Sequence, residues 1–166
     1  MTNLELTIKS LRNKFLTIDC NVFLLLVVGN IGLDNIEKFK RTNIFQKEDY
    51  PLLIKLIEGS KLILTPNVLT EASNLLESYN KQIDNLAFLS LKKLIELNEE
   101  SYLSSIQLSN SYCYLKFGLT DSSLFELSEK GVVTLTTDFP LFGLLQSRGL
   151  PAINFNQVRS ERILNG

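Results

Sequence analysis

The chain contains no histidine and no tryptophan, and among its 166 residues there are only two cysteines and one methionine. Without histidine, these residues cannot supply a histidine general base, a Ser-His-Asp triad or the histidine ligands of most zinc enzymes. Any hydrolytic chemistry must therefore use carboxylates, metal-bound water, or Ser, Lys or Cys nucleophiles.

The two cysteines and the short apolar runs limit the cellular setting. Cys20 and Cys113 are too far apart in sequence for a disulfide framework or a zinc-binding spacing. Cys20 lies in an apolar run, so we expect a small buried thiol in a reduced, cytoplasmic protein. The longest apolar run, Val22 to Val28, is too short to span a bilayer. The first residues lack the apolar core of a secretory signal, and we expect no membrane partner.

Composition and length indicate one globular domain. The chain is 45% hydrophobic and 21% charged, which argues against disorder. A length of 166 residues suits a single domain with its own core, at about residues 15–155, and a short tail at 156–166. The net charge of −1 excludes a broadly basic nucleic-acid coat but still allows a local basic rim.

Short apolar, β-branched segments recur along the chain and predict strands. These segments are Phe15–Ile18, Leu62–Leu64, Val132–Leu135 and Ala152–Phe155. The stretch 102–108 is ambiguous and could be a short edge strand. Because helical patterns separate the strands and the connections are short, we expect an α/β fold with a mostly parallel sheet covered by helices.

The helices are predicted from their caps and apolar spacing. We expect Asn21 to cap a helix that Gly29 and Asn30 close, and the Thr65-Pro66 step to begin another. Apolar residues at helical spacing predict a helix within 36–59 as well. Further helices are expected at 81–98, at 109–117 with Gly118 as the stop, at 120–131 and at 138–148. The tail at 156–166 is expected to be either a short helix or disordered.

Four acidic residues occur where predicted strands end or helices begin. They are Asp19, Glu71, Asp121 and Asp138, separated by 52, 50 and 17 residues. Each one alone could be a helix cap, a first-turn acid or an ordinary surface side chain. A parallel sheet, however, gathers the carboxyl ends of its strands into one crevice, where ligands bind. Carboxylates crowded there should raise at least one pKa, and Mg²⁺ or Mn²⁺ is the natural cation for an all-oxygen site.

The segments that contain these acids resemble the PIN-domain ribonucleases. The resemblance rests on four short motifs in the order of that family: Asp19-Cys20-Asn21, the helix from Thr65-Pro66 to Glu71, Gly118-Leu119-Thr120-Asp121, and Thr136-Thr137-Asp138. It extends over about residues 15–155. Each motif alone is weak, and the four together in order are fairly specific.

The resemblance implies a three-layer α/β/α PIN-like domain, similar to a Rossmann fold, and a Mg²⁺- or Mn²⁺-dependent endoribonuclease. Asp19, Asp121 and Asp138 would hold the metal, and Glu71 would complete the negative pocket or orient the water. Asn21 and Thr137 could hydrogen-bond water or a carboxylate; Thr137 could equally be an ordinary strand-end residue. Small members of the family include toxins of toxin–antitoxin pairs, so an antitoxin-like protein inhibitor is a candidate partner.

An acidic site needs nearby cations if RNA is to approach it. Lys38, Lys40 and Arg41 form one local basic cluster, and Arg159 and Arg162 form another. We predict that these residues contact the phosphates of RNA beside the acidic site, against the plainer interpretation of solvated surface. If neither cluster binds RNA, the groove of a homodimer could provide the path instead.

Other functions fit the residues less well. Haloacid-dehalogenase-type phosphatases need Asp-x-Asp after the first strand, where this chain has Asn21. Response-regulator receivers need an early acidic pair and a late strand-end lysine; Asp34 and Glu37 are poor candidates for the pair, and no such lysine is evident. A non-catalytic PIN-like module that binds RNA or a partner protein remains the main alternative.

Overall fold

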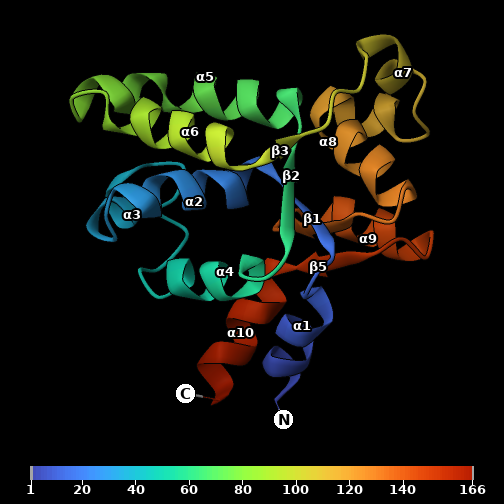
Figure 1. Cartoon of the computed structure of the whole chain (residues 1–166), viewed down its shortest axis with the longest axis horizontal. Helices are drawn as coiled ribbons and strands as arrows, with labels where there is room; N and C mark the ends of the chain where they lie inside the picture. The colour runs from blue at the N-terminus through green and yellow to red at the C-terminus, as the bar shows by residue number, and fades with distance from the viewer. Residues whose placement is uncertain (1, 166) are drawn as a thin grey trace.

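A five-stranded, all-parallel sheet forms the centre of the computed structural model, which describes residues 2–165 (Figure 1). The strand order is β3-β2-β1-β4-β5. The strands are β1 (Phe15–Ile18), β2 (Lys61–Leu64), β3 (Glu99–Glu100), β4 (Val133–Thr136) and β5 (Ala152–Asn154). The α/β class and the four predicted strands in one parallel sheet are therefore confirmed.

Helices flank this sheet. They are α1 (Asn3–Leu11), α2 (Cys20–Ile31), α3 (Asp34–Lys38), α4 (Asp49–Ile57), α5 (Pro66–Gln82), α6 (Leu86–Leu97), α7 (Ser105–Ser109), α8 (Tyr114–Glu129), α9 (Phe139–Ser147) and α10 (Phe155–Asn165). Helices α2, α5 and α6 pack against one another, whereas α8 and α9 pack against β4 and β5. Among residues 2–165, no helix is long and apolar enough to cross a membrane.

The strand order places a topological switch between β1 and β4. The chain leaves β1 toward β2 and β3, and it leaves β4 in the opposite direction toward β5. At such a point the connections diverge, and a crevice opens outside the carboxyl ends of the two strands. Asp19 follows β1, and Thr137 and Asp138 follow β4, so the sequence places acids on both sides of this crevice.

Helix α2 anchors the crevice to the core. Residues 22–29 are all buried, which is typical of a central helix that is apolar on every side. The helix begins at Cys20 because Asp19, rather than the predicted Asn21, is its N-cap: the Asp19 carboxylate accepts from the Val22 amide at 2.7 Å. The predicted stop at Gly29 and Asn30 is also wrong, since the helix continues to Ile31.

Gly29 has a packing role instead of a stop role. A Cβ at this position would lie 2.1 Å from a ring carbon of Tyr50, so only glycine lets the Tyr50 ring approach α2 this closely. The closeness of the two elements is a tertiary contact, and the local sequence pattern gave no indication of it.

Several other boundaries differ from the prediction. The helix predicted at 81–98 is divided because Asp84 and Asn85 have positive φ angles and separate α5 from α6. The edge strand is Glu99–Glu100 and not 102–108, where Ser104 caps α7. Gly118 has non-helical dihedral angles and interrupts α8, so the predicted break at this glycine is present, but the first part of the helix begins at Tyr114 and not at 109. The last strand ends at Asn154, because Phe155 already belongs to α10, and the tail is helical up to residue 165.

Candidate active site

Asp19 is the most deeply buried of the four acids, with 4% of its surface exposed. Its backbone N–H continues the sheet by donating to the Leu135 carbonyl at 3.1 Å. Its Oδ2 accepts from the Thr136 hydroxyl and from the Thr137 amide, the latter at 2.7 Å. Burial raises the pKa of Asp19, and these hydrogen bonds together with the Val22 amide partly oppose that rise. The carboxylate is thus fixed between the ends of β1 and β4.

Asp138 caps α9, as its position after β4 predicted. Its Oδ1 accepts from the Leu141 amide at 2.7 Å, and Pro140 lies in the first turn. Its own backbone N–H donates to the Thr136 hydroxyl oxygen at 2.9 Å. Thr136 therefore links Asp19 and Asp138. The sequence analysis missed Thr136, although its place directly before Thr137-Asp138 was a signal for it.

Asp121 lies three residues beyond the kink of α8. Gly118 has φ 77° and ψ −172°, a conformation that favours glycine and lets the helix restart in a new direction. No hydrogen bond to the half-buried Asp121 side chain occurs within residues 2–164. Its pKa is raised to about 7, first by burial and then by the charges of Asp138, Asp19 and Glu71.

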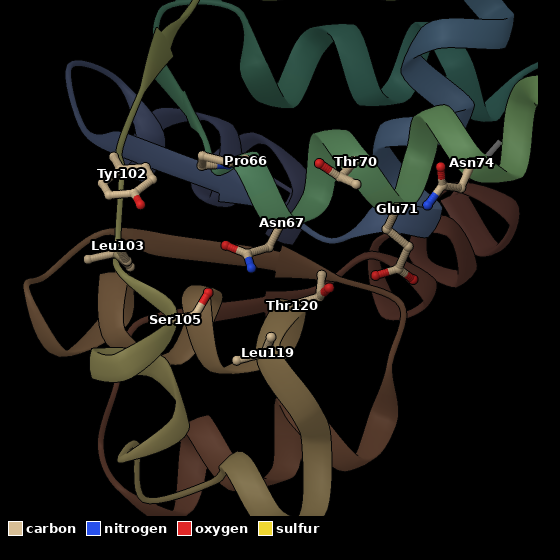
Figure 2. Close-up of a pocket in the computed structure, with 10 residues that line it drawn as sticks. All are labelled: Pro66, Asn67, Thr70, Glu71, Asn74, Tyr102, Leu103, Ser105, Leu119 and Thr120. Atoms are coloured by element: carbon tan, nitrogen blue, oxygen red, sulfur yellow. The ribbon is translucent and has the colours of Figure 1, made fainter.

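Glu71 approaches from α5, which begins as predicted with Thr65 as its cap and Pro66 in its first turn. The Thr65 hydroxyl lies 3.0 Å from that of Ser123 on α8, so a buried contact joins the two helices below the site. The Glu71 side chain is exposed and borders an opening between α5 and α8 (Figure 2). It is the outermost of the four carboxylates.

The four carboxylates influence one another across the crevice. The shift in the Asp121 pKa arises in part from each of the other three acids, as expected for like charges brought together. The nearby Cys20 thiol is affected by the same negative charges. Its pKa is raised first by burial and then by Glu71, Asp19 and Asp121. The raised pKa of Asp121 agrees with the expectation that crowding disfavours the charge of at least one acid, and burial is its larger cause.

The neighbours predicted to support the acids are present. The Thr137 amide and hydroxyl both donate to Asp19 Oδ2, so Thr137 hydrogen-bonds a site carboxylate. Asn21 is exposed, and its amide donates to the Thr137 hydroxyl at 3.5 Å. From α10, Asn156 donates to the Thr137 carbonyl at 3.3 Å. Three elements therefore hold the turn after β4 in place.

The donor set suits a hard divalent cation, although the carboxylates are not drawn tightly together. Among residues 2–165, no three acidic or cysteine side chains lie close enough to share one metal ion. Charge coupling extends over longer distances than coordination does. Mg²⁺ usually keeps several waters and binds through one or two carboxylates, so a compact three-ligand cluster is not required. Unused acceptor oxygens remain on Asp121, on Asp138 Oδ2 and on Glu71.

No lysine or arginine within residues 2–164 forms an ion pair with any of the four acids. Arg159 and Arg162, predicted as RNA contacts, instead pair with Asp49, at 2.8 and 3.2 Å. Both arginines are therefore engaged internally. Lys38, Lys40 and Arg41 are exposed at the end of α3, which Figure 1 shows on the opposite side of the molecule from α8.

Comparisons with known proteins give this chain no relative. No family model, no curated protein and no solved structure matches it. A function for this chain must therefore be inferred from the geometry and chemistry of the crevice.

Proposed function

We propose that the chain is a Mg²⁺- or Mn²⁺-dependent endoribonuclease with a PIN-like three-layer α/β/α domain. The main support is one observation: four carboxylates from separate elements lie around the topological switch point, near enough to raise the pKa of Asp121, and no lysine or arginine among residues 2–164 forms an ion pair with them. Such a concentration of negative charge is unfavourable in an isolated protein. It becomes favourable when a divalent cation binds.

The reaction that fits these residue types is phosphodiester hydrolysis. It requires an activated water, in-line attack and stabilisation of charge on the phosphoryl oxygens. A bound divalent cation lowers the pKa of water and acts as a Lewis acid, which replaces the missing histidine.

Each acid has a distinct role in this proposal. Asp121 and the free oxygen of Asp138 would hold the cation from α8 and α9. Asp19 would contribute through the remaining lone pair of Oδ1, which also accepts from the Val22 amide, or through water, because its Oδ2 is already occupied by Thr136 and Thr137. Those two threonines keep the carboxylate oriented. Glu71, exposed at the rim, would accept a hydrogen bond from the attacking water.

The test is cleavage of RNA by the purified protein with Mg²⁺ or Mn²⁺ and its loss with a chelator. Asp121→Asn is the sharpest variant, because the Asp121 side chain makes no hydrogen bond within the described chain. Asp19→Asn is less clean, since an amide group would face the donors from Thr136 and Thr137. Asp84→Asn, an exposed change in the turn after α5, removes the same charge away from the site and should leave cleavage unchanged.

A non-catalytic module that binds RNA or a partner protein is the second candidate. It is favoured by one observation, that no three acids among residues 2–165 approach one another closely enough to share an ion. Cleavage that survives both the chelator and Asp121→Asn would indicate a contaminating nuclease and support this alternative. An antitoxin-like inhibitor or a homodimer could exist under either function.

A further inference from the structure

Beside the four acids lies a separate opening with different chemistry. It has a volume of about 400 Å³, within the range of small-ligand sites. It lies between α5, the segment after β3, the start of α7 and the part of α8 just beyond Gly118. Glu71 and Thr120 form the side nearest the acidic crevice, and Asp121 follows Thr120 directly. A ligand in this opening would therefore adjoin the reacting centre.

The helix α5 presents a row of polar side chains to the opening. Asn67, Thr70, Glu71 and Asn74 are spaced three, four and seven residues from the first, so they share one helix face. Figure 2 shows the Asn67 amide between the two helices. Within residues 2–164, no hydrogen bond engages the side-chain amides of Asn67 or Asn74. An amide offers a donor and an acceptor together, the pattern that reads base edges.

Tyr102 stands at the other end of the opening and is held there by its neighbours. The Ser101 amide donates to the Leu64 carbonyl at 2.8 Å, which extends the pairing of β3 with β2. Leu103 is buried, and Ser104 caps α7. Between these anchors the Tyr102 ring is 79% exposed, although an aromatic ring gains most from burial. The backbone on both sides of Tyr102 is therefore anchored, while the ring itself is exposed.

The floor of the opening is apolar. Leu103 belongs to a small hydrophobic cluster with Leu108, Leu127 and Val132, and Leu119 packs against it. An apolar floor, amide groups on one wall and an exposed aromatic ring together match the chemistry of a flat, polar-edged ring system. Single-stranded RNA is commonly bound in this way, by stacking on aromatic side chains and by hydrogen bonds to unpaired base edges.

We propose that this opening is a nucleobase subsite, in which Tyr102 stacks on an unpaired base and Asn67 hydrogen-bonds its edge. The inference rests on the proposed action on RNA and deepens it. The base in the opening would belong to the nucleotide next to the phosphodiester that is cleaved at the four acids. A duplex would hide this base, so the chain selects single-stranded RNA.

The test measures binding without cleavage. Fluorescence anisotropy follows a short, labelled single-stranded oligoadenylate RNA titrated with the Asp121→Asn protein in a chelator. Adding Tyr102→Ala should weaken binding about tenfold, because stacking on the ring is lost. Adding Tyr102→Phe should change it less than about twofold, since the stacking face remains. Thermal melting shows that each variant is folded, which the exposure of Tyr102 favours.

Two further readouts separate stacking from a general loss of affinity. The dependence of binding on salt should be unchanged by Tyr102→Ala, because base stacking releases no counterions. A ribose-phosphate chain lacking bases should bind the Ala and Tyr proteins equally. Equal RNA binding by the Ala and Tyr proteins, or equal weakening by Ala and Phe, would overturn the subsite. If wild-type cleavage fails while the Tyr102 effect holds, only the proposed nuclease activity falls.

Discussion

Asp49 and the four crevice acids differ in whether the chain supplies a positive charge to balance their negative charge. Asp49, fully buried at the start of α4, is paired with two arginines from α10, and Arg159 also donates to Asn156 and the Ile44 carbonyl. The crevice acids have neutral hydrogen-bond donors at most, and no cation among residues 2–164. At Asp49 the arginines balance the charge, and the ion pairs join α4 to α10. The crevice acids leave their charge for something outside the chain.

Buried ionisable groups differ according to whether the chain supplies a partner for their charge. A buried charge with a partner inside the chain is typical of a structural element, whereas one without a partner costs free energy and indicates a binding function. Removing a carboxylate should therefore have opposite effects on stability at the two places.

The largest expected change in the free energy of unfolding comes from substituting Asp49. Asp49→Asn should lower the free energy of unfolding by about 3 kcal/mol, because it leaves two arginines partly buried without their counter-charge. Urea unfolding measures this loss. Asp34→Asn, which removes an exposed ion pair with Lys47, should change stability far less, because solvent screens a pair at the surface. Equal losses of unfolding free energy in the two variants would show that the buried ion pairs of Asp49 matter no more than an exposed one.

At the crevice, removing a carboxylate should increase stability instead of decreasing it. Asp121→Asn should raise the free energy of unfolding by about 1–2 kcal/mol at pH 8 in a chelator, because it removes a charge that burial and three other acids disfavour. The estimate is reduced for the partial exposure of Asp121. The same urea titration at pH 8 decides the sign. Destabilisation by Asp121→Asn would mean that the acids are compensated within the chain.

The pH dependence of stability should follow from the same residue. The pKa of Asp121 is about 7 in the folded chain against an ordinary value of 3.8, so the folded state binds its proton more tightly. The stabilising effect is complete below about pH 4 and is lost as the pH rises through 7. Unfolding in a chelator at several pH values should show this fall, and Asp121→Asn should flatten it.

The smallest predicted effect concerns the turn that positions Asp121. Gly118→Ala should destabilise the protein by about 1 kcal/mol, because φ 77° disfavours a residue with a Cβ. Gly143→Ala, inside α9 with open space around its Cβ, is the matched control and should be neutral or slightly stabilising. Thermal melting compares the two. A Gly118→Ala protein as stable as the control would show that the kink tolerates other residues.

The sequence predicted the sheet because its strands follow from local patterns. Apolar runs such as Phe15–Ile18 can only be strands of a covered sheet, and residues after parallel strands must share an edge. Asp19 and Asp138 were placed correctly for this reason. Asp121 was found through its neighbouring Gly118, whose special conformation is also local.

What the sequence could not predict depends on contacts between distant segments. The pairing of Asp49 with Arg159 joins residues 110 positions apart, so both arginines appeared available for RNA. The close approach of Gly29 to Tyr50 made a glycine inside a helix resemble a stop. The opening beside Glu71 combines three segments whose side chains have no shared sequence signal.

The most direct test of the central claim is a calorimetric titration of Mg²⁺ or Mn²⁺ into the wild-type protein and into Asp121→Asn. If the crevice acids are assembled for a cation, the wild type should bind the ion saturably, and Asp121→Asn should lose most of that binding while remaining folded. Asp84→Asn should bind like the wild type. Absence of binding in the wild type, or equal binding by the wild type and Asp121→Asn, would contradict the account.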